Sequence, residues 1–143
     1  MRPSRGDEGI RSDQTGQMSR LIDEKNVWVC TVRADGRPHL TPIWFVFHAD
    51  RFWIATGADG VKTKNVGRNP KVSLSLEDGN APVVAEGTVV VHDAPFPPDV
   101  VTAYMGKYGW DVSRDEDEEI GRIVLWEVTV ERWLMGGPDT AAP

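Results

Sequence analysis

The sequence predicts a mainly β domain, built as a small antiparallel barrel with short helices, and two observations support this fold class. Short runs of β-branched and aromatic residues recur along the chain, separated by turn sequences such as Asp-Gly. Two of these runs, "VWVCTV" and "IWFVF", are apolar on both faces and therefore need cover on both sides. A closed barrel with helices or a partner subunit packed outside it provides that cover.

The size and charge of the chain indicate a single domain and disfavour nucleic-acid-binding and membrane proteins. With 143 residues, 40% of them hydrophobic, the chain can build one ordinary core. The formal net charge of −6 disfavours general nucleic-acid binding, which needs a broad positive surface. The sequence contains neither a bilayer-length apolar run nor the apolar region of a signal peptide, so we expect a cytoplasmic protein with no membrane partner.

Cysteine and histidine give no support for a metal site. Cys30 is the only cysteine, which excludes a disulfide or a cysteine metal site within one chain. His39, His48 and His92 lie in or beside different predicted strands and lack metal-ligand spacing, so we expect surface or turn roles for them. We predict no metal.

The chain divides into one domain and two tails. Residues 1–17 are polar and show almost no hydrophobic periodicity, which predicts a flexible tail. The domain covers residues 18–136 and begins with a short helix over 19–26, with Ser19 near its N-cap. Residues 137–143 are predicted to be a C-terminal tail.

Six strands are expected from the patterns of apolar and turn residues. The strand "KVSLSLE" alternates cleanly, with Val72, Leu74 and Leu76 on one face. The six strands are predicted at residues 27–34, 39–47, 51–56, 71–77, 82–93 and 122–134.

Two helices are expected between these strands. One covers about residues 60–68, with Asp59 as its N-cap. The other begins at Pro98 and ends at Gly109, and its apolar residues follow helical spacing. The acidic stretch 111–121 after it is expected to form a solvated turn or a short helix.

A basic cluster in and just after the first of these helices is the main candidate site. Lys62, Lys64, Arg68 and Lys71 fall within a short stretch of an acidic chain. A helix N-terminus with free N–H groups and lysines beside it can bind a phosphate. A solvated basic face explains the same spacing, so the residues alone leave both interpretations open.

The strand containing Pro42 is the second candidate. A proline in a strand removes a ladder donor, which indicates an edge, a bulge or an approach to a ligand. Flat side chains over residues 41–45 could lie against a planar heterocycle. An ordinary core role for Ile43, Trp44 and Phe45 remains equally open.

The order of these motifs resembles the pyridoxamine-phosphate-oxidase-like superfamily, and especially its branch of deazaflavin (coenzyme F420) dependent reductases. The resemblance is carried by "GRPHLTPIWF" and by a K-x-x-N-[LV]-x-x-N-P-x-V pattern beginning at Lys62, and it covers residues 18–136. It implies a six-stranded antiparallel split β-barrel (FMN-binding split barrel). The chain lacks the longer C-terminus of true pyridoxamine phosphate oxidases, so that reaction is not expected.

The resemblance also implies a cofactor site. Lys62 and Lys64 would bind the cofactor phosphate. Further cofactor-binding residues are expected beside the phosphate and along the ring, namely Asn65, Thr56 and Gly57, and Thr41, Pro42, Ile43 and Trp44. The family is typically homodimeric, with each active site completed at the subunit interface.

We therefore expect an oxidoreductase that binds coenzyme F420 and transfers a hydride to an unsaturated small-molecule substrate. An FMN-dependent oxidoreductase of the same fold and a non-catalytic flavin or deazaflavin binder are the alternatives. No motif identifies a catalytic acid, base or nucleophile, so the redox chemistry would come from the cofactor.

Overall fold

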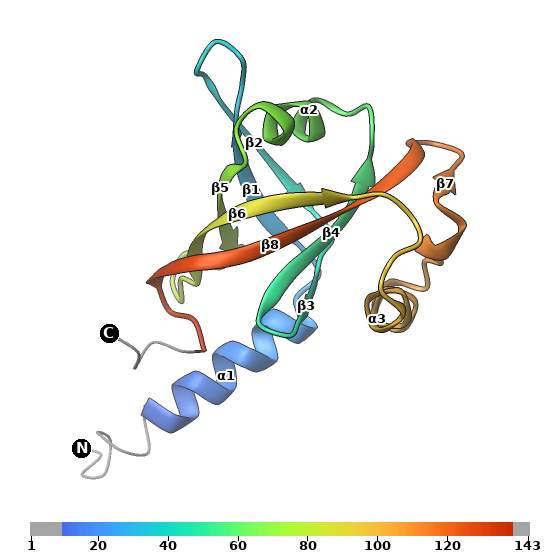
Figure 1. Cartoon of the computed structure of the whole chain (residues 1–143). Coiled ribbons are helices and arrows are strands. Elements are labelled where there is room, and N and C mark those ends of the chain that lie inside the picture. The colour runs from blue at the N-terminus through green and yellow to red at the C-terminus, as the bar shows by residue number, and fades with distance from the viewer. Residues whose placement is uncertain (1–9, 139–143) are drawn as a thin grey trace, which may run out of the picture.

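The computed structural model describes residues 10–138 and shows a strongly curved antiparallel sheet with helices at its two ends and on its outer face (Figure 1). Seven strands follow the hydrogen-bonded order β2-β1-β5-β6-β8-β4-β3, and β7 pairs with β8. The strands are β1 Val27–Val32, β2 Pro38–Ile43, β3 Val46–His48, β4 Arg51–Gly57, β5 Lys71–Leu76, β6 Val84–His92, β7 Glu116–Asp117 and β8 Gly121–Met135. The mainly β prediction is confirmed, with eight strands in the described residues where six were expected.

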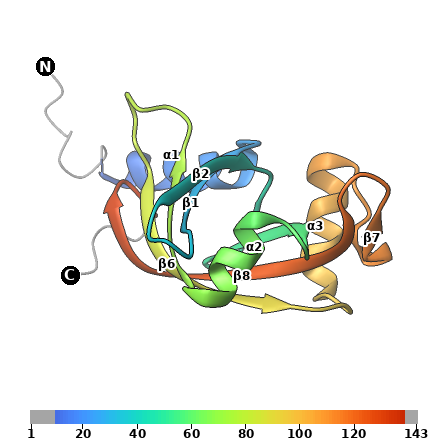
Figure 2. The ribbon, with the colours of Figure 1, turned by 90° about the horizontal axis from the view of Figure 1, so that it is seen from above.

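One extra strand arises because the expected strand 39–47 breaks at Trp44 and Phe45. The backbone of Phe45 bonds to side chains of the third helix instead of a neighbouring strand: its N–H donates to the Tyr108 hydroxyl (3.0 Å), and its carbonyl accepts from Lys107 Nζ (3.0 Å). The break turns the chain from one edge of the sheet, β2, to the other edge, β3. The sheet is therefore curled into a half-barrel, as seen from above in Figure 2.

The inside of the curled sheet holds the main core. Alternate residues of each strand point inward, such as Phe52 and Ile54 on β4, Val29 on β1 and Trp126 on β8, and all are nearly or fully buried. Helix α1 (Ile10–Asp23) adds Leu21 to this core, and helix α2 (Val61–Arg68) adds Val66, from opposite ends of the sheet (Figure 1). The two helices close the ends of the half-barrel.

A second core lies outside the sheet, under helix α3 (Pro98–Tyr108). Tyr104 is fully buried there, and its hydroxyl accepts from the Ala55 N–H (2.9 Å) and lies 3.1 Å from the Trp53 carbonyl. Burial raises the pKa of this hydroxyl, so it stays neutral and able to donate. Helix α3 thus covers the outward face of β4, whose inward face already lines the barrel.

The helix ends agree with the sequence at α3 and differ at α1. Helix α3 starts at Pro98 and is capped by Gly109 at φ 67°, as predicted. Helix α1 extends from Ile10, so the expected N-cap at Ser19 is wrong, and residues 10–17 of the expected tail are helical. Residues 1–9 and 139–143 of the two expected tails lie outside the described residues.

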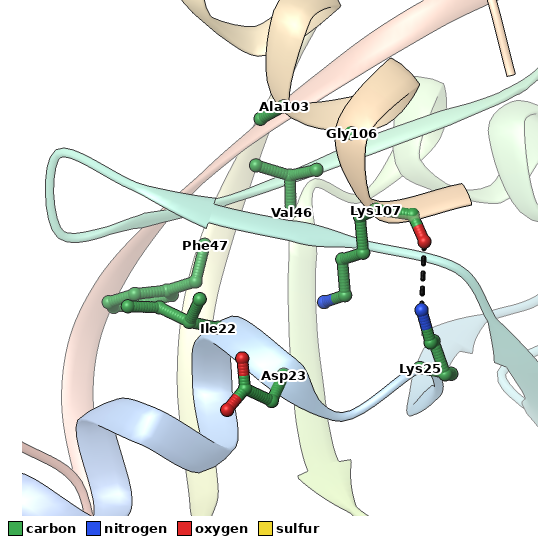
Figure 3. A pocket seen from close by; sticks show the side chains of 8 residues that line it. All are labelled: Ile22, Asp23, Lys25, Val46, Phe47, Ala103, Gly106 and Lys107. Atoms are coloured by element: carbon green, nitrogen blue, oxygen red, sulfur yellow. Dashed lines mark hydrogen bonds between the residues drawn. The ribbon is translucent and has the colours of Figure 1, made fainter. Parts of the chain in front are cut away.

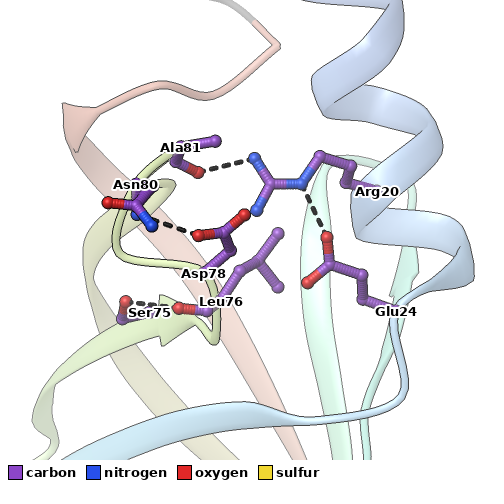
Figure 4. A network of polar contacts seen from close by, with 7 residues as sticks. All are labelled: Arg20, Glu24, Ser75, Leu76, Asp78, Asn80 and Ala81. Carbon is purple, nitrogen blue, oxygen red and sulfur yellow. Dashed lines mark hydrogen bonds and ion pairs between the residues drawn. The ribbon is translucent and has the colours of Figure 1, made fainter.

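Helix α1 is fastened to the turn between β5 and β6 by Arg20 (Figure 4). Its guanidinium pairs with Glu24 (2.6 Å) and donates to the Ala81 carbonyl (2.6 Å). In the same turn the Asn80 N–H donates to the Asp78 carboxylate (2.9 Å), which rigidifies the loop that Arg20 contacts.

The acidic stretch after α3 is mostly exposed, as expected for a solvated segment. It forms a 3₁₀ turn over Val112–Arg114 and the short strand β7. Within the described part of the chain, no helix combines the length and apolar character needed to span a membrane.

Candidate functional site

Strand β2 presents two faces of different character. His39 and Thr41 pair with Thr31 and Val29 of β1, which are buried on the inward side of the sheet, so His39 and Thr41 also face inward. Pro42 lies on the opposite, exposed face. The expected ring-bordering segment 41–44 is therefore split between two sides of the sheet.

The inward face of β2 carries two polar atoms without partners. Nδ1 of His39 and Oγ1 of Thr41 are buried, and neither has a hydrogen-bond partner among the described residues. Buried polar atoms are nearly always paired in folded proteins, and these two lie two residues apart on the same face. They offer hydrogen bonds to a ligand. His39 lies within β2 and is half-buried, so the expected surface or turn role describes it only in part.

Helix α2 is held beside this face by specific contacts. Asn65 is almost fully buried and donates through Nδ2 to the Thr31 hydroxyl (3.0 Å), directly beside His39 on the neighbouring strand. Its Oδ1 accepts from Arg68 (2.7 Å), while the Thr63 hydroxyl donates to the Gly57 carbonyl (2.7 Å). The side chain of Asn65 is thus committed to anchoring the helix.

The N-terminus of α2 begins one residue later than expected. Gly60 occupies the N-cap position in extended conformation, without a side-chain cap, so the prediction of Asp59 as N-cap is wrong. The first intrahelical bond of the helix runs from the Lys64 N–H to the Gly60 carbonyl (3.1 Å). The preceding N–H groups of the first turn have no partner within the helix and carry its positive end.

Lys62 stands out among the basic residues of this region. It is half-buried, and burial lowers the pKa of its ammonium group. It forms no ion pair with a carboxylate in residues 10–138. Lys62 therefore keeps a partly desolvated charge that an anionic ligand could neutralise.

The charge of Lys62 also affects the pKa of His39. Burial is the largest cause that lowers the pKa of His39, and the charges of Arg33 and Lys62 lower it further. His39 is therefore neutral at pH 7, and its imidazole can offer either a donor or an acceptor at Nδ1.

The other basic residues of the cluster separate in the structure. Lys64 is exposed on α2, and Arg68 is occupied by Asn65. Lys71 begins β5 and pairs with Glu131 at 3.3 Å, away from the inward face of β2. The solvated-face interpretation fits Lys64, whereas Lys62 fits a binding role.

Two predicted neighbours of the phosphate lie at the end of β4. Thr56 is buried on the inward face with Ile54. Gly57 has a packing reason of its own, since a Cβ there would lie 3.1 Å from the Ile120 carbonyl oxygen. Its glycine identity is explained without a ligand.

The two aromatic or apolar residues predicted beside the ring have different surroundings. Ile43 packs against the barrel core. Trp44 is 43% exposed and stacks on Tyr108 of α3, with ring centroids 4.4 Å apart and an interplanar angle of 9°. Trp44 therefore lies against α3 and presents an exposed indole held in a fixed orientation.

Lys62 lies close enough to His39 to lower its pKa, and Thr41 shares the inward face of β2 with His39. Lys64 is exposed, and Pro42 lies on the opposite face of β2. Motif reasoning did not select His39 as a site residue, although it lies within the quoted motif "GRPHLTPIWF". Alternation from Thr41 along β2 could have identified His39, because residues two apart share a face. A cavity of about 430 Å³ lies elsewhere, between α1, β3 and α3, and contains none of the predicted site residues.

Comparison with known proteins supports one family. The sequence model of the family described as Pyridoxamine 5'-phosphate oxidase matches residues 15–135. A search of curated proteins found no match.

Several solved structures share the fold. A conserved hypothetical protein from Mycobacterium tuberculosis is 23% identical, with a TM-score of 0.63 over 82% of this chain and 81% of that one. A protein titled F420 reductase is 19% identical, with a TM-score of 0.65 over 80% of this chain and 93% of that one. The heme storage protein HutZ from Vibrio cholerae is 17% identical, with a TM-score of 0.63 over 92% of both chains. At these identities the likeness concerns the fold, and it confirms the predicted split barrel.

Proposed function

The chain belongs to the pyridoxamine 5'-phosphate oxidase family, as the resemblance predicted, and from this premise we propose that it is a cytoplasmic oxidoreductase that binds coenzyme F420 and transfers a hydride to an unsaturated small molecule. The observation that supports the proposal most is the half-buried Lys62, which has no carboxylate partner in the described residues and lies near the unpaired polar atoms of β2. We call this group, formed by Lys62, His39 and Thr41, the β2–α2 site.

The residues of the β2–α2 site fit a phosphorylated planar cofactor. Lys62 and the free N–H groups of the first turn of α2 would hold the phosphate, because both carry uncompensated positive charge. His39 Nδ1 and Thr41 Oγ1 would bond to polar atoms of the cofactor, which would satisfy two otherwise unpaired atoms. Lys64 would add a weaker, solvent-screened attraction.

The chemistry divides between cofactor and protein. When bound, the reduced deazaflavin ring supplies the hydride. The protein positions the ring through β2, and Ile43 adds apolar surface beside the polar pair, which helps to exclude water. His39 stays neutral near Lys62, so it can bond to the cofactor without adding another positive charge.

We also propose that the active site is completed by a second copy of the chain. The outward face of β1 and β2 exposes apolar side chains directly behind the β2–α2 site: Leu40 is 59% exposed, Trp28 is 36% exposed, and Pro42 lies opposite Trp28. A contiguous apolar face of this kind is typical of an interface with another subunit.

An FMN-dependent enzyme is the first alternative, since a flavin phosphate would meet the same groups. A non-catalytic binder is the second, and one similar structure is titled as a heme storage protein.

A turnover assay tests the proposal against both alternatives. The full chain is mixed with reduced coenzyme F420 and a panel of enones and quinones, and oxidation of the cofactor is followed spectroscopically. We expect protein-dependent oxidation with at least one acceptor, retained by the control variant Lys71→Ala. Tight cofactor binding without turnover on any acceptor would contradict the enzyme proposal, and turnover only with reduced FMN would contradict the F420 assignment.

A further inference from the structure

A second cavity lies apart from the β2–α2 site, between α1, β3 and α3 (Figure 3). Its volume is about 430 Å³. Ile22, Val46 and Phe47 contribute apolar walls, and the charged residues Asp23, Lys25 and Lys107 also line it. An apolar cavity with a few convergent charged groups has the character of a small-molecule site.

Lys107 is held in a defined position in this cavity. Its Nζ donates to the Phe45 carbonyl (3.0 Å) and lies 3.9 Å from the centroid of the Phe45 ring. Figure 3 shows the amine end of Lys107 pointing into the cavity, in the direction of Ile22 and Asp23. The hydrogen bond and the cation–π contact reduce the freedom of the side chain.

A second lysine lies next to it. Lys25 Nζ donates to the backbone carbonyl of Lys107 (2.8 Å) and lies 5.3 Å from the centroid of the Tyr108 ring. Tyr108 itself is held by the Phe45 backbone, and burial raises its pKa to about 12, so it remains neutral. Two ammonium groups thus share one partly buried region.

The surroundings lower the pKa of Lys107 well below that of an ordinary lysine. Burial lowers its pKa most, Lys25 lowers it further, and the carboxylates of Asp23 and Glu24 raise it, with a resulting pKa of about 8. Glu24 forms an ion pair with Arg20, and Asp23 forms no ion pair with Lys107 in the described part of the chain. Lys107 therefore stays mostly protonated near neutral pH, but a far larger fraction of it is unprotonated than of an ordinary lysine.

We propose that Lys107 is a nucleophilic lysine that forms an imine with a small aldehyde bound in this cavity. A lysine desolvated by an apolar pocket and placed beside a second cation is the arrangement that activates an amine toward carbonyl groups. The aldehyde would carry an apolar body for the walls formed by Ile22, Val46 and Phe47, and a carboxylate for Lys25.

The reaction balances without a redox partner. The Nζ lone pair forms a bond to the carbonyl carbon, the carbonyl oxygen takes up a proton, and the resulting carbinolamine loses water to give the C=N bond. One amine and one aldehyde are consumed, and one imine and one water are formed. The step uses neither Lys62 nor the cofactor, so it stands or fails independently of the proposed function.

Reductive trapping tests the proposal on the full chain. The protein is incubated with para-carboxybenzaldehyde and sodium cyanoborohydride at several pH values, and labelling at each of the five lysines is measured by peptide mass spectrometry. At about pH 7.5 we expect Lys107 to be labelled at least about tenfold faster than Lys71, because far more of it is neutral. Labelling spread evenly over the lysines, or a Lys107 onset at the same pH as Lys71, would overturn the proposal.

Two variants test whether Lys25 in particular makes Lys107 reactive at lower pH. Lys25→Met removes a positive neighbour, so the onset of Lys107 labelling should move to higher pH. Lys71→Met, which removes a lysine outside the cavity, should leave that onset unchanged. An unchanged onset in Lys25→Met, or equal shifts in both variants, would contradict the two-lysine arrangement. The wild-type pH profile decides the proposal even if a variant folds poorly.

Discussion

Lys62 differs from the neighbouring basic residues in its surroundings. Lys64 is exposed, Arg68 is bonded to Asn65, and Lys71 pairs with Glu131, whereas Lys62 is half-buried with no ion-pair partner among residues 10–138. A desolvated charge without a counter-ion costs stability in the free protein, and ligand binding would offset that cost.

Removing this charge should therefore weaken cofactor binding. We expect Lys62→Ala to cost about 1.5 to 3 kcal/mol of binding free energy through loss of a charge-assisted contact, or about 10- to 150-fold in Kd. The measurement is a titration followed by tryptophan fluorescence.

The matched control is Lys71→Ala, which removes the same charge from a residue already paired on the outside of the sheet. Its Kd should stay within about twofold of the wild type. Equal losses of affinity in the two variants would show that only the overall charge of the protein affects binding. They would contradict a direct contact between Lys62 and the cofactor.

At the residue scale, the sequence selected Lys62 and Thr41 as cofactor-binding residues, which remains a prediction, and it did not select His39, whose Nδ1 is buried without a partner among the described residues. The motif containing Lys62 is local, so its spacing along a helix could be recognised from the sequence. The burial of His39 depends on β2 pairing with β1 and on Asn65 bringing α2 against Thr31, and these are contacts between distant segments. Alternation along β2 indicates that His39 shares a face with Thr41, but the sequence carries no signal of these contacts between distant segments.

At the scale of the elements, the backbones of β6 and β8 approach each other closely at Gly87. Gly87 lies at a register shift between β6 and β8, and a Cβ there would lie 2.5 Å from the Thr129 carbonyl oxygen. By contrast, a Cβ added to Gly67 in α2 would have no other atom within 4 Å. Only the first glycine is required by close approach of the backbones.

These two glycines give opposite predictions for stability. Gly87→Ala should lower the free energy of unfolding by about 1 to 3 kcal/mol, because two strands must separate to admit the methyl group. Gly67→Ala should raise it by about 0.4 to 1 kcal/mol, because alanine restricts the unfolded chain and favours a helix. Chemical denaturation of both variants checks the pair, and a destabilised Gly67→Ala together with an unaffected Gly87→Ala would contradict the described packing.

The elements themselves were mostly predictable, and the exceptions have identifiable causes. Strands with clean alternation, such as Lys71–Leu76, and helix α3, with proline at its start and glycine at its end, agree with the sequence. The break at Trp44 and Phe45 was missed because the side chains that bond to the Phe45 backbone come from α3, about 60 residues later. The early start of α1 was missed because residues 10–17 have little apolar periodicity.

At the scale of the whole molecule, residues 10–138 leave one face of the curled sheet without cover. Helices α1 and α2 close its ends and α3 covers β3 and β4, but the outward face of β1 and β2 exposes Trp28 and Leu40. The sequence predicted that "VWVCTV" needs cover on both sides. A second copy of the chain is the proposed cover.

A charge placed on this face should prevent dimer formation. We expect the wild type to behave as a dimer in size-exclusion chromatography with light scattering, and Leu40→Glu to behave as a folded monomer, because a carboxylate would be buried in an apolar contact. Met105→Glu is the control, since Met105 is 47% exposed on α3, away from β2. A monomeric wild type, or a dimer that persists in Leu40→Glu, would contradict the proposed interface.

The central claim is that the β2–α2 site holds a phosphorylated deazaflavin. The most direct test is a pair of parallel titrations of the wild-type protein with coenzyme F420 and with FMN, read through quenching of its six tryptophans. We expect saturable binding of both, because both carry a phosphate, with coenzyme F420 bound at least about tenfold more tightly, a difference of about 1.4 kcal/mol. Tighter binding of FMN, or no saturable binding of either cofactor, would contradict it.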